Sequence, residues 1–287
     1  MGVFKPGPLA TSQRNVIENS FRRALMRVVH DIREIIKNLR TPEAITAAIT
    51  NYQQSDAFKT LAYRSAARMV TATDVGQKKT WRLAANESTV SREIYEALRD
   101  ETRNTAVGQQ IEDLVFQNAR LISTVPQNVA RQFADFAYRQ YSKGVRPEQI
   151  AEAMQKKAPQ LTSFQVRRIA RTESAKAASA LMEARCESMQ IDFYVWYTCH
   201  DSRVRHSHDK MDGILCRWDD PPDPELLFPS KQCRDSGTHY HPGGIYNCRC
   251  IALPVIDLKT LSFPIRYAHG NKVETIRNLA QLRQIAA

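Results

Sequence analysis

The stretch Phe193-Tyr194-Val195-Trp196-Tyr197-Thr198 marks the point where this sequence changes character. Its aromatic and β-branched side chains predict a buried strand, because they fit a pleated surface that is covered by other side chains. Upstream of residue 160, apolar residues recur instead at spacings of three and four positions, which is the period of a helix. We therefore expect an α+β protein, with a mainly helical N-terminal region, then a small α+β domain, and a C-terminal helix.

This change of pattern divides the chain into three predicted parts. Residues 1–160 are expected to form a basic helical domain, and residues 161–256 the α+β domain. Residues 257–287 form a tail, whose apolar spacing predicts one amphipathic helix over 272–285.

Several residues predict where helices begin and end. Thr41 supplies a capping hydroxyl and is followed by Pro42, which is favoured at the first helical position. Pro126 is expected to break a helical run, because proline removes a backbone hydrogen bond. Thr162, with a glutamine three residues later, matches a capping box and predicts the start of a long helix over 164–189.

The region after the aromatic strand is expected to consist of short elements and loop. A short helix is predicted over 202–211, the start of a strand at 214–215, and a closing strand over 249–255. Residues 219–247 are rich in proline, aspartate, glycine and serine. A loop of that length is usually functional or is held in place by another group.

The positive charge of the chain is unevenly distributed. The net charge is +11, of which residues 1–160 carry +8 and residues 251–287 carry +3. Residues 201–250 carry −1. Such a surface attracts phosphates or an acidic protein, although a solvated helical surface is an equally simple explanation. Arg22, Arg23 and Arg27 are the arginines that we expect to contact DNA.

The sequence argues against a membrane or secreted protein. It contains no run of about 18 uncharged apolar residues. Its first residues do not combine a basic start with an apolar run, as a secretory signal would. We therefore expect synthesis in a cytoplasm, where cysteines serve as thiols or metal ligands rather than disulfides.

Cysteines and histidines gather in one segment. Five of the six cysteines, and most histidines, lie between residues 199 and 250. His208, Cys248 and Cys250 are the strongest candidates for metal ligands, and zinc is the metal that such ligands favour. The fourth ligand is left open among Cys199, Cys216, Cys233 and the nearby histidines. The alternative is a set of buried cysteines beside a hydrogen-bonded histidine.

Charged residues of the same region are expected to pair internally. Arg171 and Glu173 lie among apolar neighbours, so we predict an ion-pair network with Asp201 and Arg203. Arg203 and Arg249 also offer the forked donors that suit a carboxylate. The alternative is an anion or substrate site.

Three groups of residues occur in an order that resembles a known family. They are Arg171-Thr172-Glu173, Trp196 followed by Asp201-Ser202-Arg203-Val204-Arg205, His208 and Asp212-Gly213, and finally Asn247-Cys248-Arg249-Cys250. This order resembles the Mu F-like domain of phage head-morphogenesis proteins over about residues 163–256. The resemblance gives a structural role to Arg171, Glu173, Trp196, Asp201, Arg203, Asp212, Asn247 and Arg249.

The resemblance also implies a function. It implies a minor head protein in the interior of a phage capsid, made in the bacterial host cytoplasm and not an enzyme. The implied partners are the portal protein, capsid or scaffold proteins, and double-stranded DNA bound without sequence preference.

Two other functions are considered. The first is a metal-dependent nuclease with His206 or His208 as the base, although acidic ligands do not form a recognisable pair. The second is a toxin or transferase, since the family domain also occurs joined to effector domains.

Overall fold

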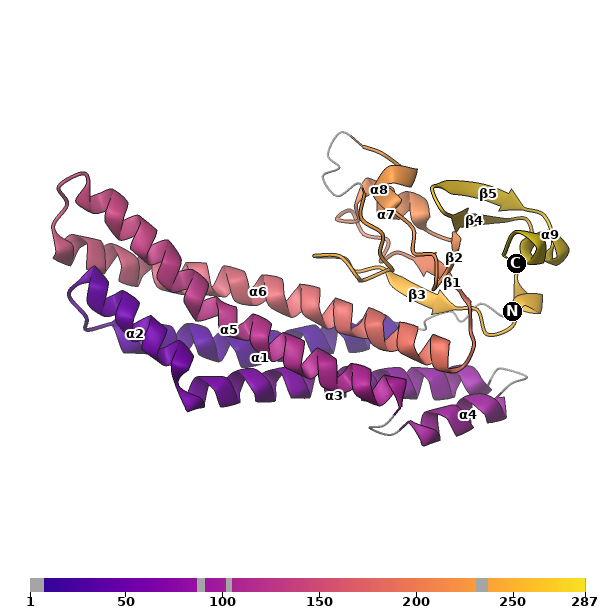
Figure 1. Cartoon of the computed structure of the whole chain (residues 1–287), viewed down its shortest axis with the longest axis horizontal. Coiled ribbons are helices and arrows are strands. Elements are labelled where there is room, and N and C mark those ends of the chain that lie inside the picture. Colours follow the sequence, from indigo (N-terminus) through magenta and orange to yellow (C-terminus); the bar gives the residue numbers. More distant parts are fainter. Residues whose placement is uncertain (1–7, 87–90, 102–104, 231–236, 287) are drawn as a thin grey trace. The chain divides into compact units, whose positions relative to one another are not determined.

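The computed structural model describes residues 8–86, 91–101, 105–230 and 237–286 (Figure 1). Six helices come first: α1 (Pro8–Ile36), α2 (Pro42–Gln54), α3 (Asp56–Asn86), α4 (Ser91–Asp100), α5 (Ala106–Tyr141) and α6 (Pro147–Ser188). Five strands follow: β1 (Phe193–Tyr197), β2 (Leu215–Arg217), β3 (Ile251–Pro254), β4 (Ile265–His269) and β5 (Lys272–Ile276). Short helices lie among and after the strands: α7 (His206–Met211), α8 (Pro224–Leu227), a 3-10 turn (Leu258–Thr260) and α9 (Leu279–Ala286). The predicted α+β fold class is confirmed.

The chain forms two compact units that do not follow the predicted domains. One unit contains the described residues of the ranges 1–15, 73–111 and 175–287, and the other contains 16–72 and 112–174. Each unit therefore takes parts of several long helices, and only the first contains the sheet. The predicted boundaries at residues 160 and 256 remain predictions about the domains.

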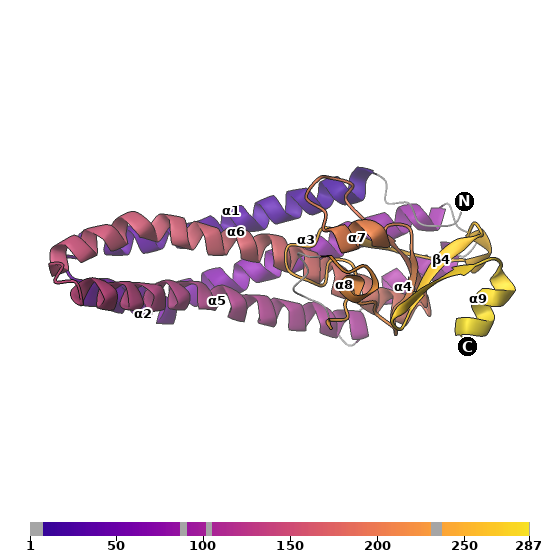
Figure 2. The same ribbon diagram turned by 90° about the horizontal axis from the view of Figure 1, so that it is seen from above.

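The second unit is built from long helices that pack through apolar stripes. α2 lies along α5 in both views (Figures 1 and 2), and a hydrogen bond of 2.8 Å joins the Tyr141 hydroxyl to Glu43. The Gln155 amide on α6 donates to the carbonyls of Ile36 and Leu39, at 2.9 and 2.8 Å. Ile32, Ile45, Ile49 and Val129 are completely buried among these helices.

Two predictions about helix ends in this unit are wrong. Pro126 does not break a helix but lies inside α5. Thr162 does not start a helix either, since α6 runs without interruption from Pro147 and contains Pro159 as well. The Thr162 hydroxyl instead donates to the Ala158 carbonyl at 2.8 Å, one turn earlier. The Thr41 cap is confirmed, because its hydroxyl oxygen accepts the Ala44 backbone N–H at 3.3 Å.

The first unit contains a five-stranded sheet with the order β3-β1-β2-β4-β5. β1 pairs antiparallel with both β2 and β3, β2 is parallel to β4, and β4 is antiparallel to β5. The predicted aromatic strand is therefore confirmed as β1, the second strand of the sheet. Both of its faces are buried, which explains why nearly every residue of β1 is large and apolar.

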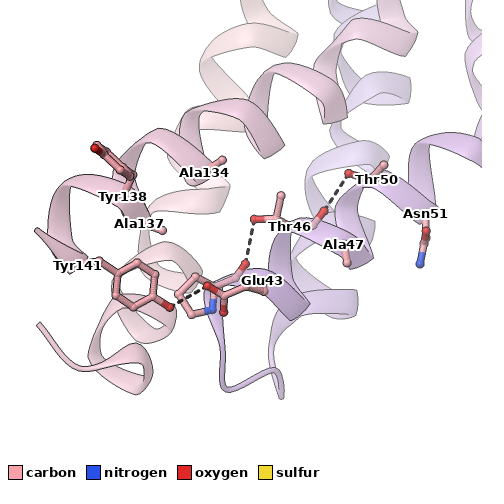
Figure 3. Close-up of a pocket in the computed structure, with 10 residues that line it drawn as sticks. Glu43, Thr46, Ala47, Thr50, Asn51, Ala134, Ala137, Tyr138 and Tyr141 are labelled. Atoms are coloured by element: carbon pink, nitrogen blue, oxygen red, sulfur yellow. Dashed lines mark hydrogen bonds between the residues drawn. The ribbon is translucent and has the colours of Figure 1, made fainter.

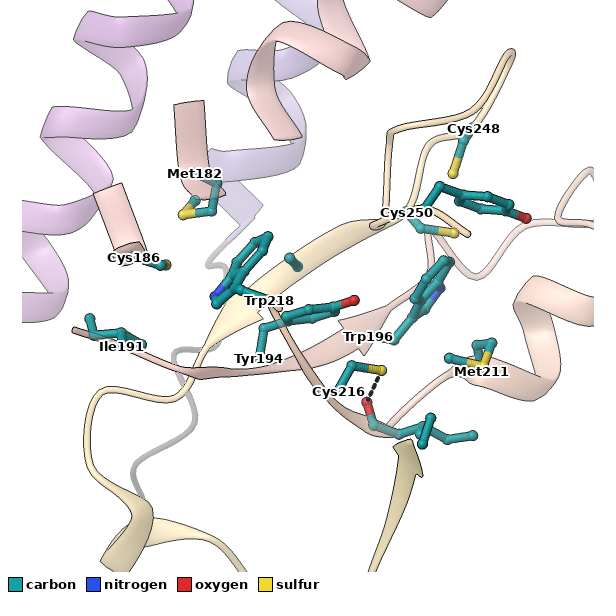
Figure 4. Close-up of a cluster of buried hydrophobic side chains, with 14 of the residues drawn as sticks. Met182, Cys186, Ile191, Tyr194, Trp196, Met211, Cys216, Trp218, Cys248 and Cys250 are labelled. Atoms are coloured by element: carbon teal, nitrogen blue, oxygen red, sulfur yellow. Dashed lines mark hydrogen bonds between the residues drawn. The ribbon is translucent and has the colours of Figure 1, made fainter. Parts of the chain in front are cut away.

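Successive residues of β1 serve two different cores. Tyr194 and Trp196 belong to a cluster with helix residues such as Met182 and Cys186 (Figure 4). Phe193 and Val195 point to the opposite face, in the second cluster. Because neighbouring side chains of β1 point to opposite faces, this one strand contributes to both cores. Each large apolar side chain that it buries stabilises the fold by about 1.5–3 kcal/mol.

The helix predicted over 272–285 is only partly correct. Residues Lys272–Ile276 form β5, and the helix α9 begins at Leu279. His269 pairs with Lys272, so Gly270 and the asparagine after it form a two-residue turn. Gly270 has φ +52°, a conformation that glycine adopts without steric cost, and the turn therefore favours a hairpin.

Within the described ranges, no helix combines the length and the apolar character that a membrane span needs.

Candidate metal centre

Three predicted ligands meet in the first unit. His208 comes from α7, and Cys248 and Cys250 come from the segment just before β3. The His208 Nδ1 atom lies 3.5 Å from the Cys248 sulfur and 3.4 Å from the Cys250 sulfur. All three ligand atoms lie within 4.8 Å of one another, and all three residues are buried. This group can hold a metal ion.

The spacing of these atoms suits tetrahedral coordination. Typical zinc bond lengths, at a tetrahedral angle, place a nitrogen and a sulfur ligand about 3.5 Å apart. The nitrogen–sulfur distances of the centre are 3.5 and 3.4 Å. The side chains therefore already have the spacing that an ion between them would require.

A buried polar network fixes the orientation of the histidine ring. The far nitrogen of His208, Nε2, lies 2.9 Å from the Tyr240 hydroxyl and 3.5 Å from a Glu225 oxygen. Tyr240 donates to the other Glu225 oxygen at 2.5 Å, and Ser207 donates to the first at 3.1 Å. A carboxylate behind a histidine is the usual support of a metal-binding imidazole, because it leaves Nδ1 to face the metal.

Burial and hydrogen bonding oppose each other in this network. Burial raises the pKa of Glu225, but hydrogen bonds with His208 and Tyr240 outweigh it and lower the pKa to about 2. Burial lowers the pKa of His208, but hydrogen bonds with Cys248 and Glu225 outweigh it and raise the pKa. Glu225 is therefore a carboxylate at neutral pH and can accept the Nε2–H of His208.

The two thiols are unequal. The hydrogen bond from the Cys250 thiol lowers the pKa of Cys248, against the effect of burial, and His208 lowers it further. The same contact, together with burial, raises the pKa of Cys250. The Gly243 backbone N–H also points at the Cys248 sulfur, at 3.3 Å. Cys248 is thus prepared as a thiolate, the form in which cysteine binds a metal.

Within the described part of the chain, no fourth residue joins this group. The Cys216 thiol donates to the Ile214 carbonyl, at 3.7 Å. His241 bonds to the Tyr194 hydroxyl and His239 to the Pro221 carbonyl, at 3.0 and 2.8 Å. Cys199 is only partly buried, and Cys233 lies outside the described residues.

Two motif residues support the centre directly. The Trp196 ring stands edge-on to the His208 ring, with 5.5 Å between the ring centroids. Figure 4 shows Trp196 close to Cys250. Asp212 accepts the Thr198 backbone N–H at 2.8 Å and the Thr198 hydroxyl at 3.1 Å, which joins the end of β1 to the end of α7.

Residues 243–250, which include Cys248 and Cys250, are called the cysteine loop below. A second group of motif residues holds this loop in place. Asp201 binds the guanidinium of Arg249 through both carboxylate oxygens, with 2.6 Å between Oδ1 and Nη2. Arg203 binds the same carboxylate at 3.1 Å. The Arg249 guanidinium therefore lowers the pKa of Asp201 well below its usual range. Asn247, just before Cys248, has φ +55°.

Arg171 has a different partner from the predicted one. It lies 3.5 Å from Glu18 on α1, whereas Asp201 pairs with Arg203 and Arg249. Arg171 and Asp201 thus belong to separate groups of ion pairs, whereas a single network was predicted. Glu173 also has interactions within the structure.

A buried charge cluster on α6 was not indicated by any pattern in the sequence. Arg185 on α6 is completely buried and binds Asp74 and Glu101, and its guanidinium also donates to the Gln77 amide oxygen at 2.5 Å. Lys78 lies 3.0 Å from Glu101. The partners are more than 80 residues away in the chain, so no local pattern could have revealed them.

The arginines expected to contact DNA are accessible. Arg22, Arg23 and Arg27 are all exposed on α1.

The second unit contains a pocket of its own. It has a volume of about 580 Å³ and lies between α2 and α5 in the second unit (Figure 3). Ala47, Ala134 and Ala137 line it, and Glu43 is engaged by Tyr141. The hydroxyls of Thr46 and Thr50, which also line the pocket, donate to the carbonyls of Pro42 and Thr46 in their own helix. The surface of the pocket is therefore mainly apolar.

Comparison with known proteins gives one family and one relative. The sequence pattern of the family described as "Phage Mu protein F like protein" matches residues 88–253. A protein of Haemophilus influenzae, described as an uncharacterized protein, is 38% identical over 89 residues. That alignment covers 31% of this chain and 17% of the relative. No solved structure matches the chain significantly.

Proposed function

The chain belongs to the family of Phage Mu protein F like proteins, and we propose that it acts as a minor head protein in phage head morphogenesis. The family match carries this proposal, because it includes all three motif groups. The match also begins at residue 88, well upstream of the predicted start near 163, so the family region includes all of α4, α5 and α6. The proposed location is the virion.

We further propose that the centre formed by His208, Cys248 and Cys250 binds zinc in a structural role. The ligand set of nitrogen and sulfur, the spacing near 3.5 Å and the carboxylate behind the histidine support this metal. Zinc would join the cysteine loop to α7. A segment as poor in secondary structure as residues 237–250 has much to gain from such a link.

The centre supports a structural role better than catalysis. The exposed fraction of His208 is 2%, and both of its ring nitrogens face other side chains. A general base must instead reach the proton that it removes from a substrate. We therefore propose that the protein is not an enzyme, which leaves the nuclease as the alternative to be tested.

The proposed partners are the portal protein, capsid or scaffold proteins, and DNA. Arg22, Arg23 and Arg27 are exposed, and the helical sequence before residue 160 carries +8. Phosphate contacts of this kind bind DNA without reading its bases. The same surface also suits an acidic face of the portal or scaffold.

Purified heads test the main proposal. Heads from the phage that encodes the chain should contain it, and deleting its gene should reduce the yield of complete heads. Its absence from heads, together with normal assembly after the deletion, would contradict the proposal. A plasmid-nicking assay with magnesium or zinc, comparing the intact protein with His208→Ala, separates the nuclease from the structural role.

Elemental analysis tests the metal. We expect close to one equivalent of zinc in the purified protein, and its loss in a Cys248→Ser, Cys250→Ser double variant. Cys216→Ser is the matched control, because that buried cysteine lies outside the centre. Less than about a tenth of an equivalent, the level of contamination, would rule zinc out.

A further inference from the structure

An arginine near the start of the chain holds the cysteine loop. Arg14 lies on α1, more than 230 residues before the loop in sequence. Its Nη1 atom donates to the carbonyls of Arg249 and Cys250, both at 3.0 Å. Its Nη2 atom donates to the carbonyl of Cys248 at 3.1 Å. One guanidinium thus binds three consecutive carbonyls, two of which belong to the candidate metal ligands.

This contact requires an arginine. The guanidinium is planar and presents several N–H donors in a fixed fork, so it can bind neighbouring acceptors together. A lysine ammonium is a single compact charge and cannot reproduce that geometry. The three carbonyls precede β3, which begins at Ile251, and Arg14 supplies donors where the sheet has not yet begun.

The loop is held on its other sides as well. The Arg249 side chain binds Asp201, as described above. Arg205 donates to the Tyr246 carbonyl at 3.0 Å and lies over the Tyr246 ring, 4.4 Å from its centroid. A Cβ atom added to Gly243 would come within 3.1 Å of the Ala175 carbonyl, so the loop packs closely against α6. Arg14 adds a further contact, which is made to the backbone carbonyls of the candidate metal ligands themselves.

We infer that Arg14 is a positioning residue of the metal centre. By fixing the carbonyls of residues 248–250, it sets the direction in which both sulfurs leave the backbone. Their distances to His208 Nδ1, 3.4 and 3.5 Å, depend on that direction. The inference rests on the proposed metal centre, and it adds that the N-terminal part of α1 is a component of it.

The expected effect is a loss of metal affinity. Residues that orient metal ligands typically change affinity by about 10–100-fold when they are replaced. We expect Arg14→Ala to weaken zinc binding by an amount in that range, and Arg14→Lys to weaken it nearly as much. Arg33→Ala is the matched control, because Arg33 is exposed on the same helix. It should leave zinc affinity unchanged.

The experiment measures two properties of the full chain. Zinc affinity is measured by competition with a coloured chelator. In the metal-free protein, the rate at which Cys248 and Cys250 react with a disulfide reagent is measured, with Cys248→Ser and Cys250→Ser variants to identify the thiols. The melting temperature of each metal-free variant separates general unfolding from a local effect.

The outcomes distinguish this inference from the proposed zinc. If the intact protein binds zinc and Arg14→Ala binds it equally well, Arg14 is not a positioning residue, although the metal centre stands. If the intact protein binds no zinc, the thiol rates decide: faster reaction in Arg14→Ala than in Arg33→Ala supports the loop contact, and equal rates overturn it. A lower melting temperature with unchanged affinity and thiol rates would show a purely structural role and also overturn the inference.

Discussion

At the scale of single residues, arginines of this chain differ in what surrounds their guanidinium groups. The Arg185 side chain is completely buried against two carboxylates. That of Arg249 is 21% exposed and binds one carboxylate, and that of Arg203 is 68% exposed beside the same group. Water screens an exposed pair but not a buried one, so the three should differ widely in their contribution to stability.

The pair between Asp201 and Arg249 predicts a pH dependence of stability. The pKa of Asp201 is lowered in the folded protein from an ordinary value of 3.8, mainly by Arg249. A carboxylate whose pKa is lowered by folding stabilises the folded protein at pH values above the pKa that it has in the unfolded chain. This stabilisation is lost as the pH falls and the carboxylate becomes protonated. The melting temperature of the intact protein should therefore be higher than that of Asp201→Asn at pH 5–7, and the difference between the two temperatures should shrink below about pH 4. Melting curves across this range measure it.

The control for this prediction is Asp209→Asn, at an exposed position on α7. Its melting temperature should follow that of the intact protein across the same range. A difference between the intact protein and Asp201→Asn that stays constant down to pH 2 would contradict the assigned pair.

The candidate metal centre was only partly predictable from the residues of the chain. His208, Cys248 and Cys250 could be chosen because cysteines and histidines are dense between 199 and 250. Glu225 lies on the four-residue helix α8 and Tyr240 in the loop after it, and neither segment is long enough in regular structure for a periodic pattern to show which side chain points inward. Arg14 is far away in sequence, and only the folded chain brings it to the loop.

At the scale of elements, prolines show how packing overrides local preference. Pro126 lies inside α5, where Ile122, Val125 and Val129 are buried around it. The apolar contacts of a helix of 36 residues outweigh one missing hydrogen bond. The sequence therefore predicted the helical regions correctly but placed false ends at Pro126 and Thr162.

Pro159 allows this effect to be measured. It lies in the interior of α6, where it removes one backbone hydrogen bond. Pro159→Ala should restore that bond and stabilise the protein by about 1–3 kcal/mol in denaturant unfolding. Pro147→Ala is the control, because Pro147 occupies the first position of the same helix, where proline is favoured. Equal effects of the two substitutions would show that the hydrogen bond missing at Pro159 does not weaken α6.

Arg185 connects α6 to α3 within the first unit. Replacing it with alanine leaves Asp74 and Glu101 without the cation that they share, although Lys78 remains near both. Removing one partner of a buried ion pair costs about 3–5 kcal/mol, and we expect that loss in Arg185→Ala by urea unfolding. Arg99→Ala, whose side chain is 81% exposed, should cost far less. A loss below about 1 kcal/mol for Arg185→Ala would mean that the cluster is solvated.

At the scale of the whole molecule, the distribution of charge decides which partners are plausible. The sequence before residue 160 carries +8, while residues 201–250, with the metal centre, carry −1. A nucleic-acid surface and the metal centre are therefore separate along the chain. A nuclease would need DNA to approach its metal, whereas a head protein can hold DNA with one region and keep its fold with another.

This separation predicts how DNA binding responds to salt and to charge. Each phosphate contact releases counterions, so binding should fall steeply as salt rises, with a slope that decreases by about 0.9 for each contact removed. Neutralising Arg22 and Arg23 with glutamine should weaken binding to all sequences alike and lower the slope by about 2, and adding Arg27→Gln should lower it further. The control pair is Arg203→Gln with Lys210→Gln, which removes two exposed charges from residues 201–250. Binding by the control pair should remain close to that of the intact protein in gel shifts at two or more salt concentrations. If the intact protein fails to bind DNA even at low salt but still associates with the portal, the basic surface of α1 serves a protein partner, because the same positive charges attract acidic side chains as readily as phosphates.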